Sequence, residues 1–391
     1  METNKRQNIK KPWGRIAICV LLLLLVAVSF FFLRHVTRML PSEQAAARWG
    51  ADAGRFAQVT GFLPEHAGLS PDAPERISFA LHGALVEQGL TPLMPEGGFS
   101  YAFAASPITL QISSRDRGPA EVFATGVGGN FFLFQSVQLI SGAYLPTDGI
   151  NHDYVVLDET LAWQLFGAVD VAGLEVFIRD QPFIIAGVYR PNGDFASRAA
   201  YGDRPHLFFF YETQAALFGA SPITMVTAVL PNPLTGLADE MFIEAMDTLG
   251  AEEDAFILVN NTGRYRLAAL FSVLRNFGVR SMYQTGLRLP YWENAARMAE
   301  DFAALALLLI ILLILYPIWC GLRLVVWRFR RRKWRVREMV EKLDSMREAR
   351  REEKWREAYP MDETEPEEQY DLEEIIRSVR ESEGEDYETE M

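Results

Sequence analysis

Two long apolar segments without a charged residue lie towards the two ends of this chain, and they constrain what the rest of it can fold into. The first covers residues 16–33, where Ser29 is the notable polar side chain, and the second covers residues 302–322. An α-helix of the first length measures about 27 Å, which is close to the hydrocarbon thickness of a bilayer. The sequence therefore predicts two transmembrane helices that enclose residues 34–301.

A cleaved signal peptide is the alternative for the first segment, because basic residues precede it and Ala45, Ala46 and Ala47 follow it. The apolar run is longer than the usual hydrophobic region of a signal peptide, however, and the three alanines lie well past its end. We therefore expect an uncleaved membrane anchor. In the second segment Pro317 is compatible with a kinked span, which membrane helices tolerate.

Basic residues on the outer flanks of the two segments set the expected orientation. Five lie within residues 1–15, and seven lie just beyond the second segment: Arg328, Arg330, Arg331, Arg332, Lys333, Arg335 and Arg337. By the positive-inside rule both termini are cytoplasmic, residues 34–301 are extracytoplasmic, and the protein is located in the cell membrane. Arg34 and Arg38 weakly oppose this orientation but are outnumbered.

The same seven basic residues are the candidate contacts for lipid or for a cytoplasmic partner. Near an anionic membrane each could contribute about 1 kcal/mol of binding free energy. We expect residues 323–360 to form a charged juxtamembrane helix, which is either solvated, or lies on anionic lipid, or docks a partner. Residues 361–391 hold fourteen acidic and two basic residues, and we expect most of this tail to be disordered.

The net charge of −13 supports the membrane assignment through its distribution. Basic residues cluster beside the two apolar segments, whereas residues 41–301 carry a net charge of −14. This distribution suits a membrane protein and not a protein that binds nucleic acid. The two cysteines, Cys19 and Cys320, both lie in the apolar segments, so the region between them has no disulfide framework.

Strand and helix signals alternate regularly in residues 121–190. An apolar strand pattern over residues 121–127 ends at Gly128 and Gly129, where positive φ costs little, and residues 131–139 are aromatic and apolar. Residues 154–157 form a compact strand pattern. Asp158 then fits the N-cap of a helix over residues 159–166.

The end of this pattern is equally clear. Gly167 is placed to stop the helix, since glycine adopts the left-handed conformation that closes a helix. Two more strands are expected over residues 174–178 and 182–188, joined by a tight turn of Arg179, Asp180 and Gln181.

This order of elements resembles the extracytoplasmic core domain of MacB-like ABC transporter permeases. The match is close over about 70 residues and looser over residues 41–300. The matching residues are Gly126-Val127, Phe131-Phe132, Ser141-Gly142-Ala143-Tyr144, residues 155–167, Asp170-Val171-Ala172-Gly173 and residues 183–188. The resemblance implies an α+β fold, with a two-lobed outer domain made of an α/β lobe and a β-rich lobe.

The flanking regions add further expected elements. Residues 41–61 have a helical pattern that suits a stalk, and residues 70–89 begin with a helix-start signature. Residues 264–277 are amphipathic and helical, and Tyr291 and Trp292 suit a membrane–water interface. Other expected elements are strands over 108–112, 207–211, 224–230 and 255–259, and helices over 212–218 and 235–249.

We find no catalytic, cofactor or metal constellation in the sequence. There is no G-x-x-x-x-G-K-[ST] motif, no G-x-S-x-G motif and no H-E-x-x-H motif, and the five histidines are scattered. The aromatic runs 131–134 and 208–210 suit either a ligand groove or the core. Core packing is the better prediction, because each run sits inside a strand pattern.

The resemblance implies a membrane-anchored, permease-like or accessory subunit of an ABC transporter, with its outer domain coupled to a separate ATPase. Partners would be the membrane, that ATPase or a permease, with a homodimer or heterodimer left open. Permeases of this family usually have three spans after the outer domain, whereas one is expected here. The alternative is an envelope sensor or scaffold. An ectoenzyme would need a clustered set of titratable side chains, which the sequence does not reveal.

Overall fold

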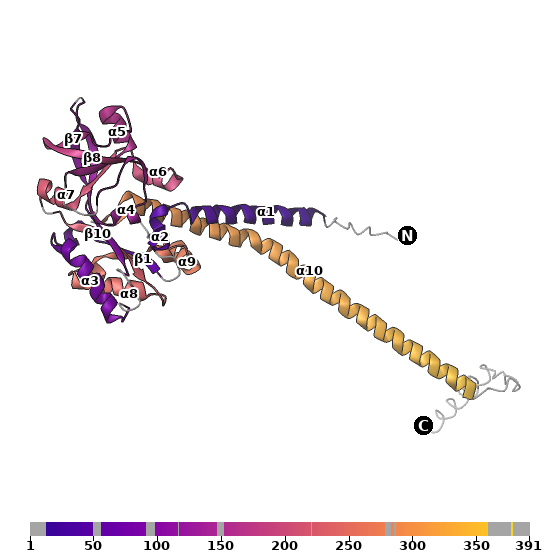
Figure 1. Ribbon diagram of the computed structural model, residues 1–391. Helices are drawn as coiled ribbons and strands as arrows, with labels where there is room; N and C mark the ends of the chain where they lie inside the picture. Colours follow the sequence, from indigo (N-terminus) through magenta and orange to yellow (C-terminus); the bar gives the residue numbers. More distant parts are fainter. Residues whose placement is uncertain are drawn as a thin grey trace, which may run out of the picture. The chain divides into compact units, whose positions relative to one another are not determined.

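A computed structural model describes residues 13–49, 56–90, 98–115, 117–146, 152–219, 221–277, 283–284, 287–358 and Arg377 (Figure 1). The chain divides into two compact units, Met1–Pro317 and Ile318–Met391. The described part is a mixture of helices and strands, so the predicted α+β class is confirmed. The predictions for residues 1–12 and, apart from Arg377, for the acidic tail lie outside the described residues.

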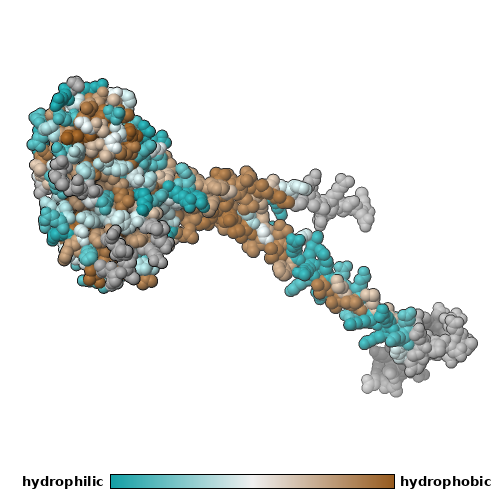
Figure 2. Space-filling view, in the orientation of Figure 1, coloured by the Kyte–Doolittle hydropathy of each residue, from teal (hydrophilic) through white to brown (hydrophobic). Residues whose placement is uncertain are grey.

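Within the described residues, two helices are long and apolar enough to cross a bilayer, and both contain a predicted span. They are α1 (Trp13–Val36) and α10 (Tyr291–Ala358), and Pro317 lies inside α10. Leucine and phenylalanine side chains are exposed along both helices, and Figure 2 shows their apolar surfaces in brown. The first eleven residues of α10 precede the predicted span, and several of them are buried in the folded domain of residues 34–301, which we call the outer domain after its predicted location.

One layer of the outer domain is an antiparallel sheet covered by two helices. Its strand order is β11-β1-β10-β2, and α3 packs beside α8 on the sheet. Ile77, Leu81 and Phe242 are fully buried between the helices and the strands. The elements are β1 (Phe56–Phe62), α3 (Ala73–Glu87), β2 (Ser100–Ala105), β10 (Ile223–Pro231), α8 (Leu237–Thr248) and β11 (Ile257–Asn260).

The other part of the outer domain is a closed ring of six strands. Its order is β4-β3-β7-β8-β6-β9, and a parallel pairing of β9 with β4 closes the ring. The strands are β3 (Ile108–Ser113), β4 (Ala120–Gly129), β6 (Tyr154–Asp158), β7 (Glu175–Ile178), β8 (Gln181–Arg190) and β9 (His206–Phe210). An antiparallel ladder between β2 and β4 makes this ring and the first layer one continuous sheet.

Shorter elements complete the outer domain. Strand β5 (Gln138–Gly142) pairs with β8. The remaining helices are α2 (Ala45–Trp49), α4 (Phe131–Phe134), α5 (Glu159–Phe166), α6 (Phe195–Tyr201), α7 (Tyr211–Phe218) and α9 (Leu267–Arg275). The 3-10 turns are η1 (Pro41–Gln44), η3 (Glu65–Ala67), η5 (Glu253–Ala255) and η6 (Asn261–Gly263), and β12 (Tyr283–Gln284) pairs with β13 (Leu287–Arg288).

The local signals between residues 154 and 190 are confirmed in detail. The Asp158 carboxylate accepts a hydrogen bond of 2.7 Å from the Leu161 amide, as an N-cap does. Gly167 ends α5 with φ of 74°. Arg179 and Asp180 have φ of 51° and 61°, the positive values of a tight hairpin turn between β7 and β8.

Two predictions of secondary structure are wrong. The aromatic run 131–134 is the short helix α4 and not part of a strand, because β4 ends at Gly129 with φ of 65° and the chain turns there. Residues 41–61 are not one helix. They begin with η1 and α2. Residues 56–62 then form β1, which lies between β10 and β11 in the sheet. The β-branched side chains of Val59 and Thr60 favour a strand.

Gly187 on β8 provides a test of the contact between β5 and β8. A Cβ atom at this position would lie 2.8 Å from the Ser141 carbonyl oxygen and still closer to that of Ala143, so the backbone of the neighbouring segment would have to move. We expect Gly187→Ala to lower the free energy of unfolding by about 1–3 kcal/mol. Thermal unfolding of the detergent-solubilised chain, followed by circular dichroism, measures this loss.

The matched control is Gly193→Ala, since a Cβ atom there meets no atom within 4 Å. Equal melting temperatures for the two variants would contradict the close approach of β5 to β8.

Candidate functional site at the helix–domain junction

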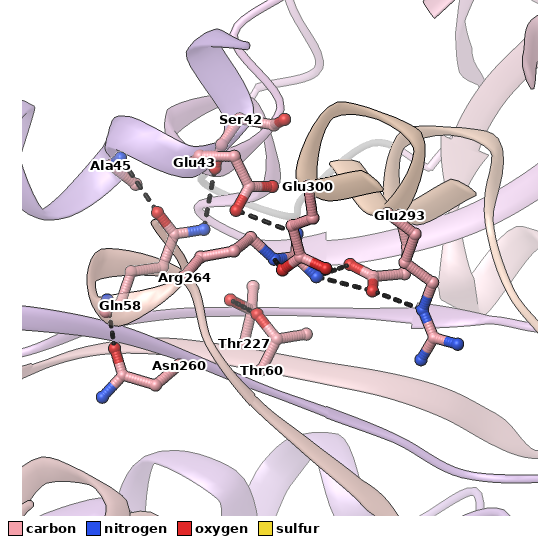
Figure 3. Close-up of polar contacts among 12 residues, drawn as sticks. Ser42, Glu43, Ala45, Gln58, Thr60, Thr227, Asn260, Arg264, Glu293 and Glu300 are labelled. Carbon is pink, nitrogen blue, oxygen red and sulfur yellow. Dashed lines mark hydrogen bonds and ion pairs between the residues drawn. The ribbon is translucent and has the colours of Figure 1, made fainter. Parts of the chain in front are cut away.

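Five charged side chains are buried together where α10 and the segment after α1 meet the outer domain (Figure 3). We call them the junction cluster: Glu43, Arg264, Glu293, Arg297 and Glu300. None of the five is more than 8% exposed. Charged residues are almost never this buried unless they are paired, so the cluster calls for a physical account.

Arg264 lies at the centre and contacts three carboxylates from two other segments. Its Nη2 lies 2.6 and 2.8 Å from the two carboxylate oxygens of Glu293. Its Nη1 lies 3.0 Å from Oε2 of Glu43, and its Nε lies 2.6 Å from Oε1 of Glu300. The guanidinium group donates hydrogen bonds to Glu293 through Nη2, whereas its contacts with Glu43 and Glu300 are ion pairs by distance.

The positions on α10 explain how one helix supplies three members. Glu293, Arg297 and Glu300 are spaced at i, i+4 and i+7, which places them on one face of the helix. Arg297 Nε lies 2.9 Å from Oε1 of Glu293, an i, i+4 pair that continues the network along this face. The acidic face of α10 therefore meets Arg264 directly, just before the predicted span.

Local hydrogen bonds hold the other two members in place. Asn260 caps η6 by accepting 2.9 Å from the Gly263 amide, and Arg264 follows that turn. The side chain of Gln58 on β1 accepts 3.0 Å from the Ala45 amide and donates 2.8 Å to the Ser42 carbonyl. Gln58 thus holds the segment that contains Glu43 against the sheet (Figure 3).

Burial and pairing shift the protonation of the cluster. Burial raises the pKa of Glu43 to about 7, although the Arg264 guanidinium opposes this rise. Burial also disfavours the charge of Arg264, but the carboxylates of Glu293 and Glu43 outweigh it and raise the pKa of Arg264. Three carboxylates face two guanidinium groups, so protonation of Glu43 would bring the cluster to neutrality.

An apolar layer lies beside the junction cluster and ties the same elements together. Val36 at the end of α1 and Leu40 after it are buried in one cluster with Ala295, Ala299 and Ala303 of α10. The small alanine side chains allow close contact between segments. The ends of the two predicted spans are therefore packed on each other and on the outer domain.

A second polar contact joins the start of α10 to the ring of strands. The free oxygen of the Asp158 carboxylate accepts 2.6 Å from the Tyr201 hydroxyl and 2.8 Å from the His206 amide. The Tyr201 hydroxyl lies 3.0 Å from that of Tyr189. The ring of Tyr291, the first residue of α10, packs edge-on against both Tyr201 and His206.

These groups are buried, and burial shifts the pKa values of both Asp158 and His206. Burial raises the pKa of Asp158, although the hydrogen bonds from Tyr201, Leu161 and His206 oppose the rise. Burial lowers the pKa of His206 to about 4, so its ring is neutral at pH 7. A hollow of about 240 Å³ lies beside Tyr201, His206 and Tyr291.

The expectation that Tyr291 and Trp292 face a membrane interface is wrong. Trp292 is 8% exposed and packs edge-on against Phe131, and Tyr291 joins the contact with Asp158 described above. These aromatic rings anchor α10 in the outer domain because they complete the core between α4 and β9.

The seven predicted contact residues, Arg328, Arg330, Arg331, Arg332, Lys333, Arg335 and Arg337, all lie on α10 in the second unit and are exposed. The Arg331 guanidinium stacks on the Trp327 ring at 3.9 Å. Their contact with lipid or a partner stays a prediction.

The two aromatic runs lie mainly in the core, as predicted, and parts of them border a cleft. Phe131, Phe134, Phe208 and Phe209 are buried in the core. Phe131, Phe132 and Phe210 also line a cleft of about 730 Å³, together with Tyr101, Phe103 and Tyr144. Among the described residues no group of three His, Cys, Asp or Glu side chains is placed to hold a metal ion.

Sequence reasoning missed the junction cluster and the contacts of Asp158. The members of the cluster come from residues 43, 264 and 293–300, and their proximity is not visible in local patterns. One usable signal was present: Glu293, Arg297 and Glu300 share a helical face in an alanine-rich stretch immediately before an apolar span. Charges on such a face need partners once the helix is buried.

Comparisons with known proteins found one family model and several similar solved structures. A family model described as MacB-like periplasmic core domain matches residues 22–235, more than half of the chain. The structure is similar to the periplasmic region of MacB from Actinobacillus actinomycetemcomitans, with 17% identity, 57% of this chain and 94% of that chain covered, and a TM-score of 0.39. A comparison with curated proteins found no match.

A second solved structure is also similar to this chain. It is the extracellular domain of the ABC-type transporter YknZ from Gram-positive bacteria, with 13% identity. The similarity covers 52% of this chain and 100% of that chain, with a TM-score of 0.35.

Removing Arg264 tests the energetic role of the junction cluster. Arg264→Met leaves Glu43 and Glu300 buried without the guanidinium group, and a buried ion pair broken on one side costs about 3–5 kcal/mol. We expect a corresponding loss in the free energy of unfolding of the full chain in detergent, measured by chemical denaturation.

The control is Arg76→Met on α3, which breaks an exposed pair of 3.2 Å with Asp72, the residue before that helix. Exposed pairs of this kind contribute little to stability, because water and salt screen the two charges. A loss in Arg264→Met no larger than that of the control would show that the cluster is not structural.

The raised pKa of Glu43 predicts a pH dependence of stability. The folded state keeps the Glu43 proton up to about pH 7, whereas the unfolded state loses it near the ordinary value of 4.5. The folded state binds more protons in this window, so the free energy of unfolding falls as pH rises from 4.5 to 7, by at most about 3 kcal/mol. Glu43→Gln should remove this component, which melting temperatures at several pH values measure.

The exposed acid Glu252 supplies the comparison, because Glu252→Gln should keep the wild-type pH dependence. If Glu43→Gln and wild type gave parallel curves between pH 4.5 and 7, Glu43 would not hold a proton in the folded state.

Proposed function

Since the chain belongs to the family of proteins with a MacB-like periplasmic core domain, we propose that it is a membrane-anchored subunit of an ABC transporter. In this proposal the subunit is permease-like or accessory, and a separate ATPase moves its outer domain. The chain contains no P-loop motif, so ATP hydrolysis would be supplied by the partner.

The junction cluster is the observation that best supports mechanical coupling. Arg264 of the outer domain pairs with Glu43, which follows α1, and with Glu293 and Glu300 of α10. Breaking these pairs would leave unpaired charges in a buried site. A movement of either membrane helix would therefore carry the outer domain with it and would not simply bend the connection.

The proposed topology places residues 16–33 and 302–322 in the membrane and residues 34–301 outside the cytoplasm. Both termini are then cytoplasmic, with residues 1–15 preceding the first span. Residues 323–360 follow the second span, and residues 361–391 form the acidic tail. The exposed basic residues 328–337 on α10 would lie on the cytoplasmic leaflet or against the ATPase.

We propose no catalytic role for the outer domain. The titratable side chains that gather there are engaged with one another. Both oxygens of Asp158 accept hydrogen bonds from Leu161, Tyr201 and His206, which supports a structural role for this carboxylate.

The second candidate is an envelope sensor or scaffold, in which the same outer domain acts without transport. The length of α10 favours it, because the helix continues from the outer domain to Ala358 and carries a strongly basic stretch for recruitment. In this case a signal from the outer domain would reach a cytoplasmic partner through α10.

Co-purification in a mild detergent separates the two candidates. We expect the full-length chain to recover an ABC ATPase or a permease, identified by mass spectrometry, and a chain lacking residues 328–391 to lose it. Deletion of residues 361–391 alone is the matched control, because it keeps the basic stretch of α10. Absence of both partners from full-length material, under conditions that preserve known complexes, would contradict the transporter proposal and favour the sensor.

A further inference from the structure

Helix α9 has two apolar sides, and protein covers one of them. Leu270 and Val273 are buried, with exposed fractions of 1% and 7%. Leu267 and Phe271 lie on the neighbouring side and are 64% and 51% exposed. These two residues are spaced by four positions, so they form a continuous stripe along the helix. Phe277, two residues beyond α9, is also 49% exposed.

The covered side fixes the position of α9 relative to the predicted spans. Leu270 and Val273 are packed in one apolar cluster with Val36 and Ala299. Val36 lies three residues beyond the first predicted span and Ala299 three residues before the second, or about 4.5 Å of helix in each case. The headgroup region on each side of a bilayer is about 5–8 Å thick. If the spans are placed as proposed, α9 lies at the level of the lipid headgroups.

Helix α6 on the same side of the outer domain supports this level. The ring of Phe195 in α6 packs edge-on against Phe302, the first residue of the second predicted span, at 5.0 Å. Figure 1 shows both α6 and α9 beside the roots of α1 and α10. This side of the outer domain is therefore the side that faces the membrane.

The charge of this region differs from that of the rest of the outer domain. Apart from Arg264, which is buried and paired in the junction cluster, residues 255–292 contain four arginines and no Asp or Glu, although residues 41–301 as a whole carry a net charge of −14. Arg266 and Arg275 are exposed at the two ends of α9. Arg34 and Arg38, which weakly opposed the predicted orientation, are exposed at the end of α1. Arginine side chains at such positions can reach lipid phosphates while their stems remain in apolar surroundings.

We propose that α9 is an interfacial helix that binds the outer leaflet of the membrane. Leu267 and Phe271 enter the boundary between headgroups and acyl chains, and Arg266 and Arg275 contact phosphates. The side of α9 that carries Ala268 and Ser272 faces water. This inference rests on the membrane anchoring proposed above, and it adds a lipid contact of the outer domain that is separate from the two spans.

Lipid binding by α9 would determine how the outer domain responds to the membrane helices. A rigid domain held by two helices and a third, interfacial contact has a set height and tilt above the bilayer. Because Arg264 immediately precedes the segment that leads into α9, the junction cluster and the lipid contact belong to one short stretch of chain. A shift of α10 would then move α9 along or out of the lipid surface.

Spin labels in the full-length chain test this contact. The two native cysteines are replaced in a Cys19→Ser, Cys320→Ser background, and the protein is reconstituted in vesicles of phosphatidylcholine and phosphatidylglycerol. Single cysteines are introduced by Leu267→Cys and Phe271→Cys on the stripe and by Ala268→Cys and Ser272→Cys on the polar side. Phe79→Cys on α3, where Phe79 is 76% exposed, supplies the water reference. Leu24→Cys in α1 supplies the bilayer reference.

The readout is the ratio of collision rates with oxygen, which partitions into lipid, to those with a water-soluble nickel chelate. We expect this ratio at positions 267 and 271 to be several-fold higher than at positions 268, 272 and 79. Equal ratios at the stripe and at position 79 would overturn the proposal. Labels at 267 and 271 that are shielded from both reagents would also overturn it, because a protein partner or a second copy would then cover the stripe.

The label at position 24 distinguishes a failure of the lipid contact of α9 from a failure of the proposed membrane spans. If the collision ratio at position 24 is high, as in the bilayer, while the ratios at positions 267 and 271 equal that of the water reference, the lipid contact of α9 is wrong and the membrane anchoring stands. If position 24 also reports water, the proposed spans are wrong and the interfacial role of α9 fails with them.

Discussion

The architecture of this protein depends on the burial of one guanidinium group. Arg264 is 4% exposed, and a charge in such surroundings is tolerated only when carboxylates replace the lost water. Its partners come from the segment after α1 and from α10, so three distant parts of the chain must meet for the charge to be satisfied. The connection between the two predicted membrane helices and the outer domain is therefore specified by electrostatics as well as by apolar packing.

This requirement explains several features around the junction. Gln58 fastens the segment of Glu43 to β1, and the alanines of α10 allow the ends of the spans to approach. Tyr291 and Trp292 extend the attachment of α10 towards the ring of strands. The raised pKa of Glu43, caused by burial, leaves the cluster close to a change of charge at neutral pH. We expect the connection at the junction cluster to be rigid as long as its charged side chains remain paired with one another.

Local chemistry made the central part of the fold predictable. The capping carboxylate of Asp158, the left-handed Gly167 and the turn at Arg179 and Asp180 each act through neighbours within a few residues. The helix expected over residues 41–61 is wrong at residues 56–61, because strand β1 depends on β10 and β11, which lie more than 160 positions away. The junction cluster was missed for the same reason: its partners are brought together by the tertiary fold, and a charged residue beside a span looks like an ordinary interfacial residue.

Amide hydrogen exchange in wild type and Arg264→Met tests the central claim most directly. If Arg264 holds the helices to the outer domain, the described amides of residues 41–49 and 291–301 exchange slowly in wild type and lose protection in the variant. The layer of α3 and α8 would keep its protection, because its core does not include the cluster. Unchanged exchange at both segments in the variant would contradict the account, since the helices would then be held without the buried charge.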